Sequence, residues 1–196
     1  MLEKTSIALT EFFCRKGAID ASKKSIFIYG FQLALSTLCS LISISILSVC
    51  LGTPLSALMF FLVFFCTRLF SGGYHASSYH RCFLLTNTVY LAIVLFAGLF
   101  ARTSSFLFHI FIQAIAGVVI LVLAPIRHPN HPLSETIYQR NQKTARWMVV
   151  LFELSFPLLY YLSGNLYLMS LFSASLMAVV ILMIIPKYQE RRGHHE

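Results

Sequence analysis

The stretch SGGYHASSYHRC, residues 71–82, places two histidines and a cysteine between long apolar runs. Cysteine suits nucleophilic acyl transfer, because its thiolate attacks a carbonyl carbon well. A neighbouring imidazole can accept the thiol proton and later give it to the leaving amine. His75 and Cys82 are therefore candidates for the base and the nucleophile of a cysteine peptidase.

The spacing of this pair requires a bend in the chain. Residues seven apart on a continuous helix share a face but lie about 10 Å apart along the axis, too far for a hydrogen bond. Gly72 and Gly73 permit a tight turn, and Ser77 or Ser78 can begin a new helix. We therefore expect a bend that brings imidazole and thiol together.

Charge near the segment favours the same chemistry, although two other interpretations remain open. Arg68, His80 and Arg81 add positive charge that favours thiolate over thiol. In one alternative, the cysteine and histidine are neighbours by chance. In the other, His75, His80 and Cys82 hold a metal ion, but three ligands without a nearby fourth match no familiar zinc spacing. No metal or other cofactor is expected.

Composition indicates an integral membrane protein. Hydrophobic residues make up 58% of the 196 residues, charged residues only 11%, and the mean hydropathy is +0.77. Once several spans of roughly 20 residues are subtracted, no room remains for a large soluble domain. We expect residues 1–196 to form a single membrane domain. The five cysteines suit no disulfide framework and are expected to be reduced.

The apolar runs predict an all-α protein with about six membrane-spanning helices. The second and fifth runs are short, so either could be tilted or partly re-entrant. Glu153 is the only acid within a predicted span, and we expect it to face protein, paired with a polar or cationic group; the alternative is a protonated acid in a helix contact. The predicted spans are residues 25–51, 54–70, 83–101, 104–126, 147–163 and 165–185.

The distribution of basic residues predicts the orientation. Cytoplasmic loops retain lysine and arginine, and every one except Arg102 falls on the same side of the predicted spans. Residues 1–24, 71–82 and 186–196 are therefore predicted to be cytoplasmic. Residues 5–21 of the first segment resemble an amphipathic helix lying on that face. The positive inner face suits anionic lipid or an acidic partner, and no nucleic-acid partner is expected.

Two segments of the chain resemble the accessory gene regulator B (AgrB) family, the membrane peptidases that process quorum-sensing propeptides in Gram-positive bacteria. RLFSGGYHASSYHRC is similar to the active-site segment of that family, and LAPIRHPNHPLSE resembles its Ala-Pro…Asn-x-Pro loop. The matching positions of the first segment are Arg68, Gly72, Gly73, His75, Ala76 and Cys82. Those of the second are Ala124, Pro125, Asn130 and Pro132.

The resemblance implies a function and two catalytic roles. His75 would be the general base and Cys82 the nucleophile of an endopeptidase that cuts an AgrD-like propeptide at the cytoplasmic face of the cell membrane. The thioester acyl-enzyme would keep the acyl-transfer potential needed to close a thiolactone or lactone ring. Which of these two rings forms is left open, and a homodimer is also implied.

Several residues are candidates for supporting roles. Ser77 or Ser78 could orient the imidazole, and N–H groups near Gly73 or at the start of the following helix could hold the oxyanion. Arg68 could reach the inner interface or bind a substrate carboxylate. The remaining candidates for substrate binding or support are Gly72, Arg81 and Glu153.

Two rival classes of function remain. A small transporter or exporter would use polar residues within the spans, namely Gln32, His109, Gln113 and Glu153, to line a path. A non-enzymatic membrane scaffold would need none of this chemistry. Small residues in the fourth span, Ala114, Gly117 and Ala124, would allow the close helix approach of a homodimer.

Overall fold

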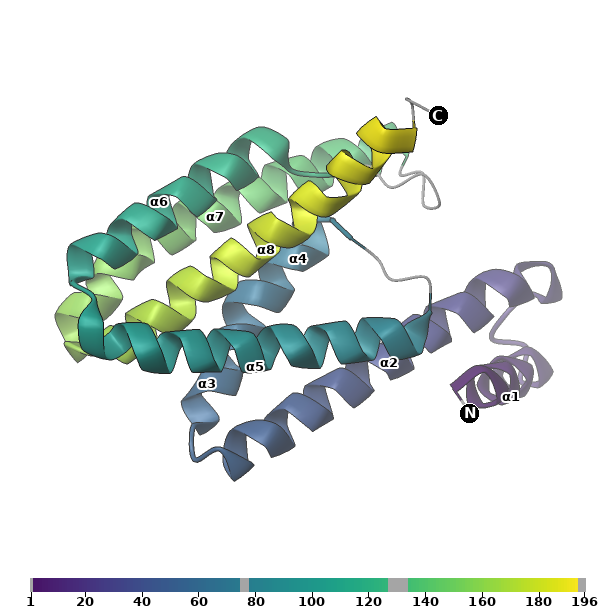
Figure 1. The fold of residues 1–196 in the computed structure, drawn as a ribbon. Helices are drawn as coiled ribbons and strands as arrows, with labels where there is room; N and C mark the ends of the chain where they lie inside the picture. The colour runs from purple at the N-terminus through teal and green to yellow at the C-terminus, as the bar shows by residue number, and fades with distance from the viewer. Residues whose placement is uncertain (1, 75–77, 127–133, 194–196) are drawn as a thin grey trace. The chain divides into compact units, whose positions relative to one another are not determined.

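The computed structural model describes residues 2–74, 78–126 and 134–193, and almost all of them are helical (Figure 1). The helices are α1 (Leu2–Arg15), the 3₁₀ helix η1 (Ala21–Lys23), α2 (Lys24–Cys50), α3 (Pro54–Phe60), the π-helix η2 (Phe61–Phe65), α4 (Cys66–Ser71), α5 (Tyr79–Thr103), α6 (Phe106–Leu123), α7 (Glu135–Ser163) and α8 (Leu166–Gly193).

The described part of the chain contains six helical segments that are long and apolar enough to cross a membrane. They are α2, the continuous run of α3, η2 and α4, then α5, α6, α7, and α8 as far as Pro186. The prediction of an all-α protein with about six spans is therefore confirmed. The chain is a multi-pass membrane protein.

Several helices extend beyond the limits that hydropathy predicted. α7 begins at Glu135, twelve residues before the predicted fifth span, so this helix is not short. α5 begins at Tyr79 and α8 runs on to Gly193, while the first helix covers Leu2–Arg15 rather than 5–21. The reason is that Glu, Gln, Lys and Arg end an apolar run without ending a helix, because all four are good helix formers.

The chain forms two compact units, which are described separately. The first unit comprises residues 1–47 and 76–88, and the second comprises residues 48–75 and 89–196. The start of α5 therefore belongs to the first unit.

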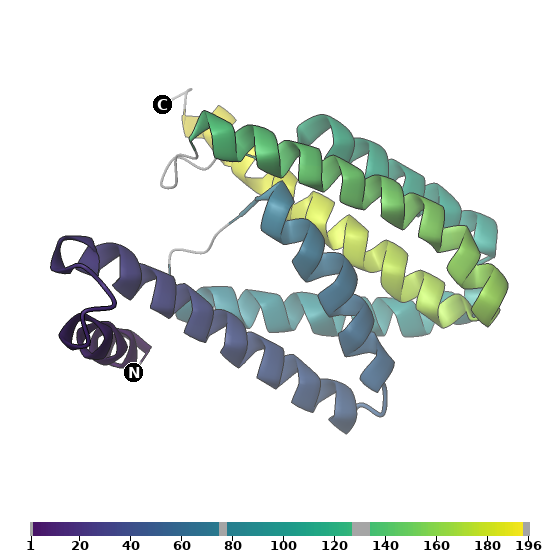
Figure 2. The ribbon, with the colours of Figure 1, turned by 180° about the vertical axis from the view of Figure 1, so that it is seen from behind.

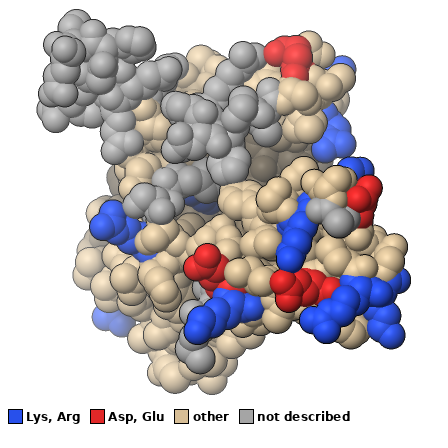
Figure 3. Space-filling view, turned by 90° about the vertical axis from the view of Figure 1, so that its right-hand side faces the viewer, with Lys and Arg blue, Asp and Glu red and all other residues tan. Residues whose placement is uncertain are grey.

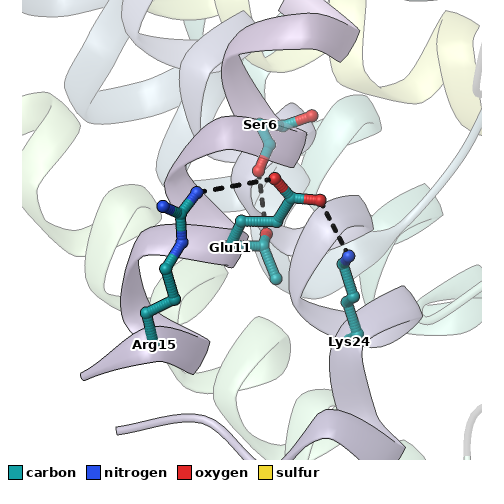
Figure 4. Close-up of polar contacts among 5 residues, drawn as sticks. Ser6, Glu11, Arg15 and Lys24 are labelled. Atoms are coloured by element: carbon teal, nitrogen blue, oxygen red, sulfur yellow. Dashed lines mark hydrogen bonds and ion pairs between the residues drawn. The ribbon is translucent and has the colours of Figure 1, made fainter. Parts of the chain in front are cut away.

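In the first unit, α1 is attached to α2 by an ion pair and an aromatic contact. Figure 4 shows the carboxylate of Glu11 between Arg15, at 4.0 Å, and Lys24, at 2.9 Å. The hydrogen bond and charge of Lys24 lower the pKa of Glu11 below its usual value. The rings of Phe13 and Phe31 stack with centroids 5.7 Å apart. These contacts hold α1 against the first turns of α2.

In the second unit, α8 is the central helix, with two-thirds of its apolar span buried. Figures 1 and 2 show α6, α7 and α8 side by side. Gly117 of α6 lies directly against the side chain of Glu153 on α7, and Ala124 is buried as well. The proposed dimer contact through these two small residues is therefore wrong, because they pack within the chain. Only Ala114 of that set is exposed.

The second span contains an aromatic cluster at its π-helix. Pro54 occupies the first turn of α3, where its missing N–H costs no hydrogen bond. The rings of Phe60 and Phe64 stack at 4.5 Å, and Tyr90 meets Phe60 edge-on at 5.4 Å. The hydroxyl of Tyr90 lies 2.6 Å from that of Ser56. This packing fixes the span directly before α4, which carries Arg68.

Candidate active site

Cys82 lies in the first turns of α5, and its side chain is half-buried. Ser78 precedes the helix and caps it: its carbonyl accepts the N–H of Cys82 at 3.0 Å, and its hydroxyl is 3.4 Å from the N–H of Arg81. The prediction that a serine here begins a new helix is therefore confirmed for Ser78. The N–H groups of the first turn make this end of α5 electropositive, which favours negative charge beside it.

Two polar contacts within the first unit hold this part of α5 against α2. The hydroxyl of Tyr79 donates to the side-chain oxygen of Gln32 at 2.9 Å. Two turns further along α5, Asn87 accepts from the hydroxyl of Ser43 at 2.8 Å and donates to the carbonyl of Phe83. Hydrogen bonds on both sides of Cys82 along the helix therefore fix the rotation of α5, and with it the direction of the thiol.

His75, Ala76 and Ser77 lie outside the described residues, and so do Asn130 and Pro132 of the second sequence segment. The described backbone ends at Tyr74 on one side of His75 and resumes at Ser78 on the other. The expected contact between His75 and Cys82 therefore stays a prediction.

The backbone of residues 71–74, from the last residue of α4 to the residue before His75, is fixed by hydrogen bonds from two distant parts of the second unit. The carbonyl of Ser71 accepts the N–H of Ile126 at 2.9 Å, and the N–H of Tyr74 donates to the carbonyl of Leu182 in α8 at 2.7 Å. This four-residue segment, hereafter the glycine segment, is thereby held at both ends.

Both glycines of the glycine segment occupy conformations that other residues avoid. Gly72 has φ 70° and ψ −152°, a region that is essentially restricted to glycine, and Gly73 has φ 125°. A Cβ at Gly72 would lie 2.9 Å from the carbonyl oxygen of Ile126, and one at Gly73 would lie 2.9 Å from that of Leu182. Neither position has room for a side chain.

The structure brings together residues 71–74 and 124–126, which are described parts, in the second unit, of the two segments that the sequence singled out. Ile126 directly follows Ala124 and Pro125, so its hydrogen bond to Ser71 joins the Ala-Pro segment to the glycine segment. Ala124 is buried, with 2% of its surface exposed. The glycine segment and residues 124–126 are thus parts of one packed structure in the second unit.

Arg68 folds back onto the glycine segment. One of its Nη atoms donates to the carbonyl of Tyr74, and its guanidinium lies 5.9 Å from the centre of the Phe64 ring. These contacts give Arg68 a role that the sequence alternatives did not include, because the guanidinium stabilises the backbone directly before His75. A guanidinium has several donors in a fixed planar geometry, so it can bond this carbonyl while it lies near the ring.

The family model for accessory gene regulator B matches residues 6–185, a range that contains nearly all of the six spans and both packed segments. The chain belongs to the accessory gene regulator B family. It is 28% identical over 173 residues to AgrB-like protein 2 of Clostridium perfringens strain 13, covering 84% of this chain and 81% of the relative. It is also 28% identical over 177 residues to an AgrB-like protein of strain SM101, with the same coverage. No solved structure matches the chain.

Membership of the AgrB family places the chain in the agr quorum-sensing system. Within this family member, the described candidate site residues of the first segment divide between the two units. Ser78, Arg81 and Cys82 lie at the start of α5 in the first unit, whereas Arg68 and the two glycines lie in the second.

Glu153 of this AgrB-family chain makes a packing contact between two helices. Its Oε1 atom is buried against Gly117 of α6 and has no hydrogen-bond partner among the described residues. The carboxyl group therefore faces protein at the contact of α6 and α7, as predicted, but the expected polar or cationic partner of Oε1 is not found among the described residues. A supporting role for Glu153 stays a prediction.

Two of the four polar residues that a transporter would use, Gln32 and His109, make local polar contacts, whereas both side-chain polar atoms of Gln113 are buried without a hydrogen-bond partner in the described part of the chain. Gln32 bonds Tyr79 within the first unit. The buried imidazole of His109 lies 2.7 Å from the hydroxyl of Ser104, 3.0 Å from that of Ser170 and 3.3 Å from that of Ser173. Gln113 is fully buried one turn further along α6. The contacts of the His109 imidazole with these three hydroxyls therefore stabilise the packing of the start of α6 against α8.

Two partners of the glycine segment were missed by sequence reasoning, the N–H of Ile126 and the carbonyl of Leu182. Backbone groups carry no residue-type signal, so the sequence indicates neither contact. One indirect signal was present: Pro186 stands four residues after Leu182 and marks a helical carbonyl that lacks its usual donor.

Proposed function

We propose that this AgrB-family chain is a membrane cysteine endopeptidase that cleaves an AgrD-type propeptide on the cytoplasmic side. Cys82 is the nucleophile and His75 the general base. The observation that carries the proposal is the anchored glycine segment, which has Arg68, Ile126 and Leu182 as its partners and runs directly into His75. A backbone that is held in unusual dihedral angles directly before a histidine is typical of sites where the position of that histidine matters for the chemistry.

The first half of the reaction is acyl transfer to the enzyme. The Sγ atom of Cys82 attacks the carbonyl carbon of the scissile peptide bond while His75 accepts the thiol proton. The N–H groups of the first turn of α5 are candidates to hold the oxyanion. Collapse of the tetrahedral intermediate breaks the C–N bond, and His75 returns the proton to the leaving amine. The products are a thioester on Cys82 and a free C-terminal peptide.

The second half closes a ring. A cysteine or serine side chain of the bound propeptide attacks the thioester carbonyl, which forms a thiolactone or lactone and releases the Cys82 thiol. Water competes for the same carbonyl. The tethered nucleophile wins because its effective concentration is far higher than that of a free reactant, and exclusion of water from a site at the membrane surface has the same effect.

The charge of the chain suits a propeptide with an acidic tail. The formal net charge is +8, and the orientation predicted above puts almost all of it on the cytoplasmic side. Figure 3 shows basic side chains with a few acidic ones among them on the face that it views. Opposite charges raise the local concentration of the propeptide at the inner surface.

A cleavage assay tests the function and separates it from both rivals. Purified protein in liposomes, given an AgrD-type propeptide, is expected to yield a released C-terminal tail and a product lighter by the mass of that tail, detected by mass spectrometry. A transporter would instead move the intact propeptide into the lumen without a change in mass. A scaffold would do neither, and either result would contradict the proposal.

The orientation has its own test. Because lysine and arginine mark the cytoplasmic side, a reporter fused after Lys187 is expected to report cytoplasm, and one inserted at Gly164 to report the outside. Paired reporters, each active in one compartment only, measure this in intact cells. The opposite pattern would put Cys82 on the external face.

A homodimer belongs to the proposal on the family resemblance alone. Since Gly117 and Ala124 are buried within the chain, the dimer would have to use other faces of the helices.

A further inference from the structure

We infer that Pro186 is a positioning residue for catalysis: by leaving the carbonyl of Leu182 without a helical donor, it creates the acceptor that holds the backbone before His75. The inference rests on the peptidase function proposed above.

The first step is the chemistry of proline within a helix. In an α-helix, the carbonyl of residue i accepts the N–H of residue i+4. Pro186 has no N–H and lies inside α8, so the carbonyl of Leu182 lacks that donor. Without another partner, this carbonyl would be a buried, unsatisfied acceptor.

The second step is the surroundings of that carbonyl. Leu182 and Met183 are 4% and 0% exposed, and α8 is the central helix of the second unit. An unsatisfied backbone group in such apolar surroundings is strongly destabilising in a membrane protein, as water cannot replace the missing donor. A donor from elsewhere in the chain is therefore strongly favoured at this point.

The third step is the identity of that donor. The N–H of Tyr74 reaches the Leu182 oxygen at 2.7 Å, and Gly73 allows the approach because a Cβ there would lie 2.9 Å from the same oxygen. Tyr74 directly precedes His75. The acceptor created by Pro186 thus fixes the peptide unit between Gly73 and Tyr74, one unit before the general base.

The bond between the Tyr74 N–H and the Leu182 carbonyl has a role that the other contacts of the glycine segment do not share. Ile126 holds the segment at Ser71, three residues before Tyr74, and Arg68 holds the Tyr74 carbonyl on the far side of that residue. Among the described contacts, the Leu182 bond alone fixes the N–H of Tyr74. Loss of this bond would leave α8 folded but would allow the backbone of Tyr74, directly before His75, to shift.

The test is Pro186→Ala in the full chain. The new alanine has an N–H that can bond the Leu182 carbonyl and so compete with Tyr74, while a better helix former keeps α8 folded. We expect faster hydrogen exchange at the Tyr74 amide and a fall in kcat of about three- to tenfold, which corresponds to one ordinary hydrogen bond. KM for the propeptide should change by less than about twofold, because positioning of the base affects the chemical step.

Pro157→Ala is the matched control. Pro157 is, besides Pro186, the proline that lies in the interior of a described helix rather than in its first turn; it is on the exposed side of α7, and its replacement also restores a helical N–H. It should leave both the Tyr74 exchange rate and kcat within about twofold of wild type. A general effect of removing helical prolines would move both variants equally and would overturn the inference.

Hydrogen exchange and cleavage distinguish the possible failures. If Pro186→Ala leaves exchange at Tyr74 unchanged, the carbonyl of Leu182 does not depend on Pro186 and the inference is wrong. Faster exchange with unchanged kcat would show that the contact exists but does not position the base, which also overturns the inference. If the wild-type protein itself cleaves no AgrD-type propeptide, the proposed function fails, and the exchange rates still decide whether the contact exists.

Discussion

Replacing Cys82 with alanine is expected to lower cleavage of an AgrD-type propeptide by about four orders of magnitude or more, while leaving propeptide binding close to wild type. Removal of the nucleophile abolishes bond making and spares ground-state contacts, and losses of this size are typical of nucleophiles that act as a unit with a base. Liposome cleavage followed by mass spectrometry measures the first quantity, and equilibrium binding of labelled propeptide the second.

The other cysteines provide matched controls within the same chain. Cys66 is half-buried like Cys82 and lies in α4, so Cys66→Ala should retain activity with at most a modest loss of stability. Cys82→Ser should cleave the propeptide far more slowly than wild type, because a hydroxyl is much harder to deprotonate than a thiol.

Labelling tests the same residue by another route. A thiol alkylator should inactivate the protein through Cys82 first, and bound propeptide should slow that labelling. A correctly inserted Cys82→Ala protein that still cleaves would end the cysteine-peptidase hypothesis.

The second large effect is expected at Gly72. Gly72→Ala forces a side chain into φ 70° and ψ −152°, at a cost of about 1–3 kcal/mol, and puts a Cβ 2.9 Å from the Ile126 carbonyl oxygen. The obstacle is backbone, which cannot rotate away as a flexible side chain would. We therefore expect the hydrogen bond between Ser71 and Ile126 to break and cleavage to fall by about one to two orders of magnitude.

Gly98→Ala is the control for this substitution. Gly98 is exposed within α5, a Cβ added to it would meet no atom within 4 Å, and its φ is not positive. Alanine there should be neutral or slightly stabilising, because it is the better helix former. Cleavage rate and thermal unfolding in detergent compare the two variants. Equal behaviour of Gly72→Ala and Gly98→Ala would mean that the glycine segment has no special role.

Local composition was sufficient to predict the helices and the identity of the candidate residues. Spans follow from apolar runs, since a bilayer demands about 20 apolar residues in helical form. The start of α5 was predicted from Ser77 and Ser78, because serine caps a helix with its own side chain. The residue types around His75 and Cys82 indicated acyl transfer, and their pattern indicated the AgrB family, which the family match confirms.

Helix ends were predicted less well, and the reason is physical. Hydropathy reports where a chain is compatible with lipid, whereas a helix continues as long as its residues tolerate helical dihedral angles. α7 therefore begins at Glu135, among polar residues that no apolar run includes. α8 likewise continues past Pro186, which marked the end of the predicted span.

The sequence alone determined that this is a six-span, all-α membrane protein with a glycine-histidine-cysteine segment suited to acyl transfer. Only the tertiary structure decided what holds the glycine segment, residues 71–74: Ile126 at one end, Leu182 at the other, and the guanidinium of Arg68 folded back on Tyr74. Ile126 and Leu182 are far from the segment along the chain, and both act through backbone atoms that every residue possesses. A hydrogen bond of this kind depends on the distance between helices, which residue types and their spacing do not encode.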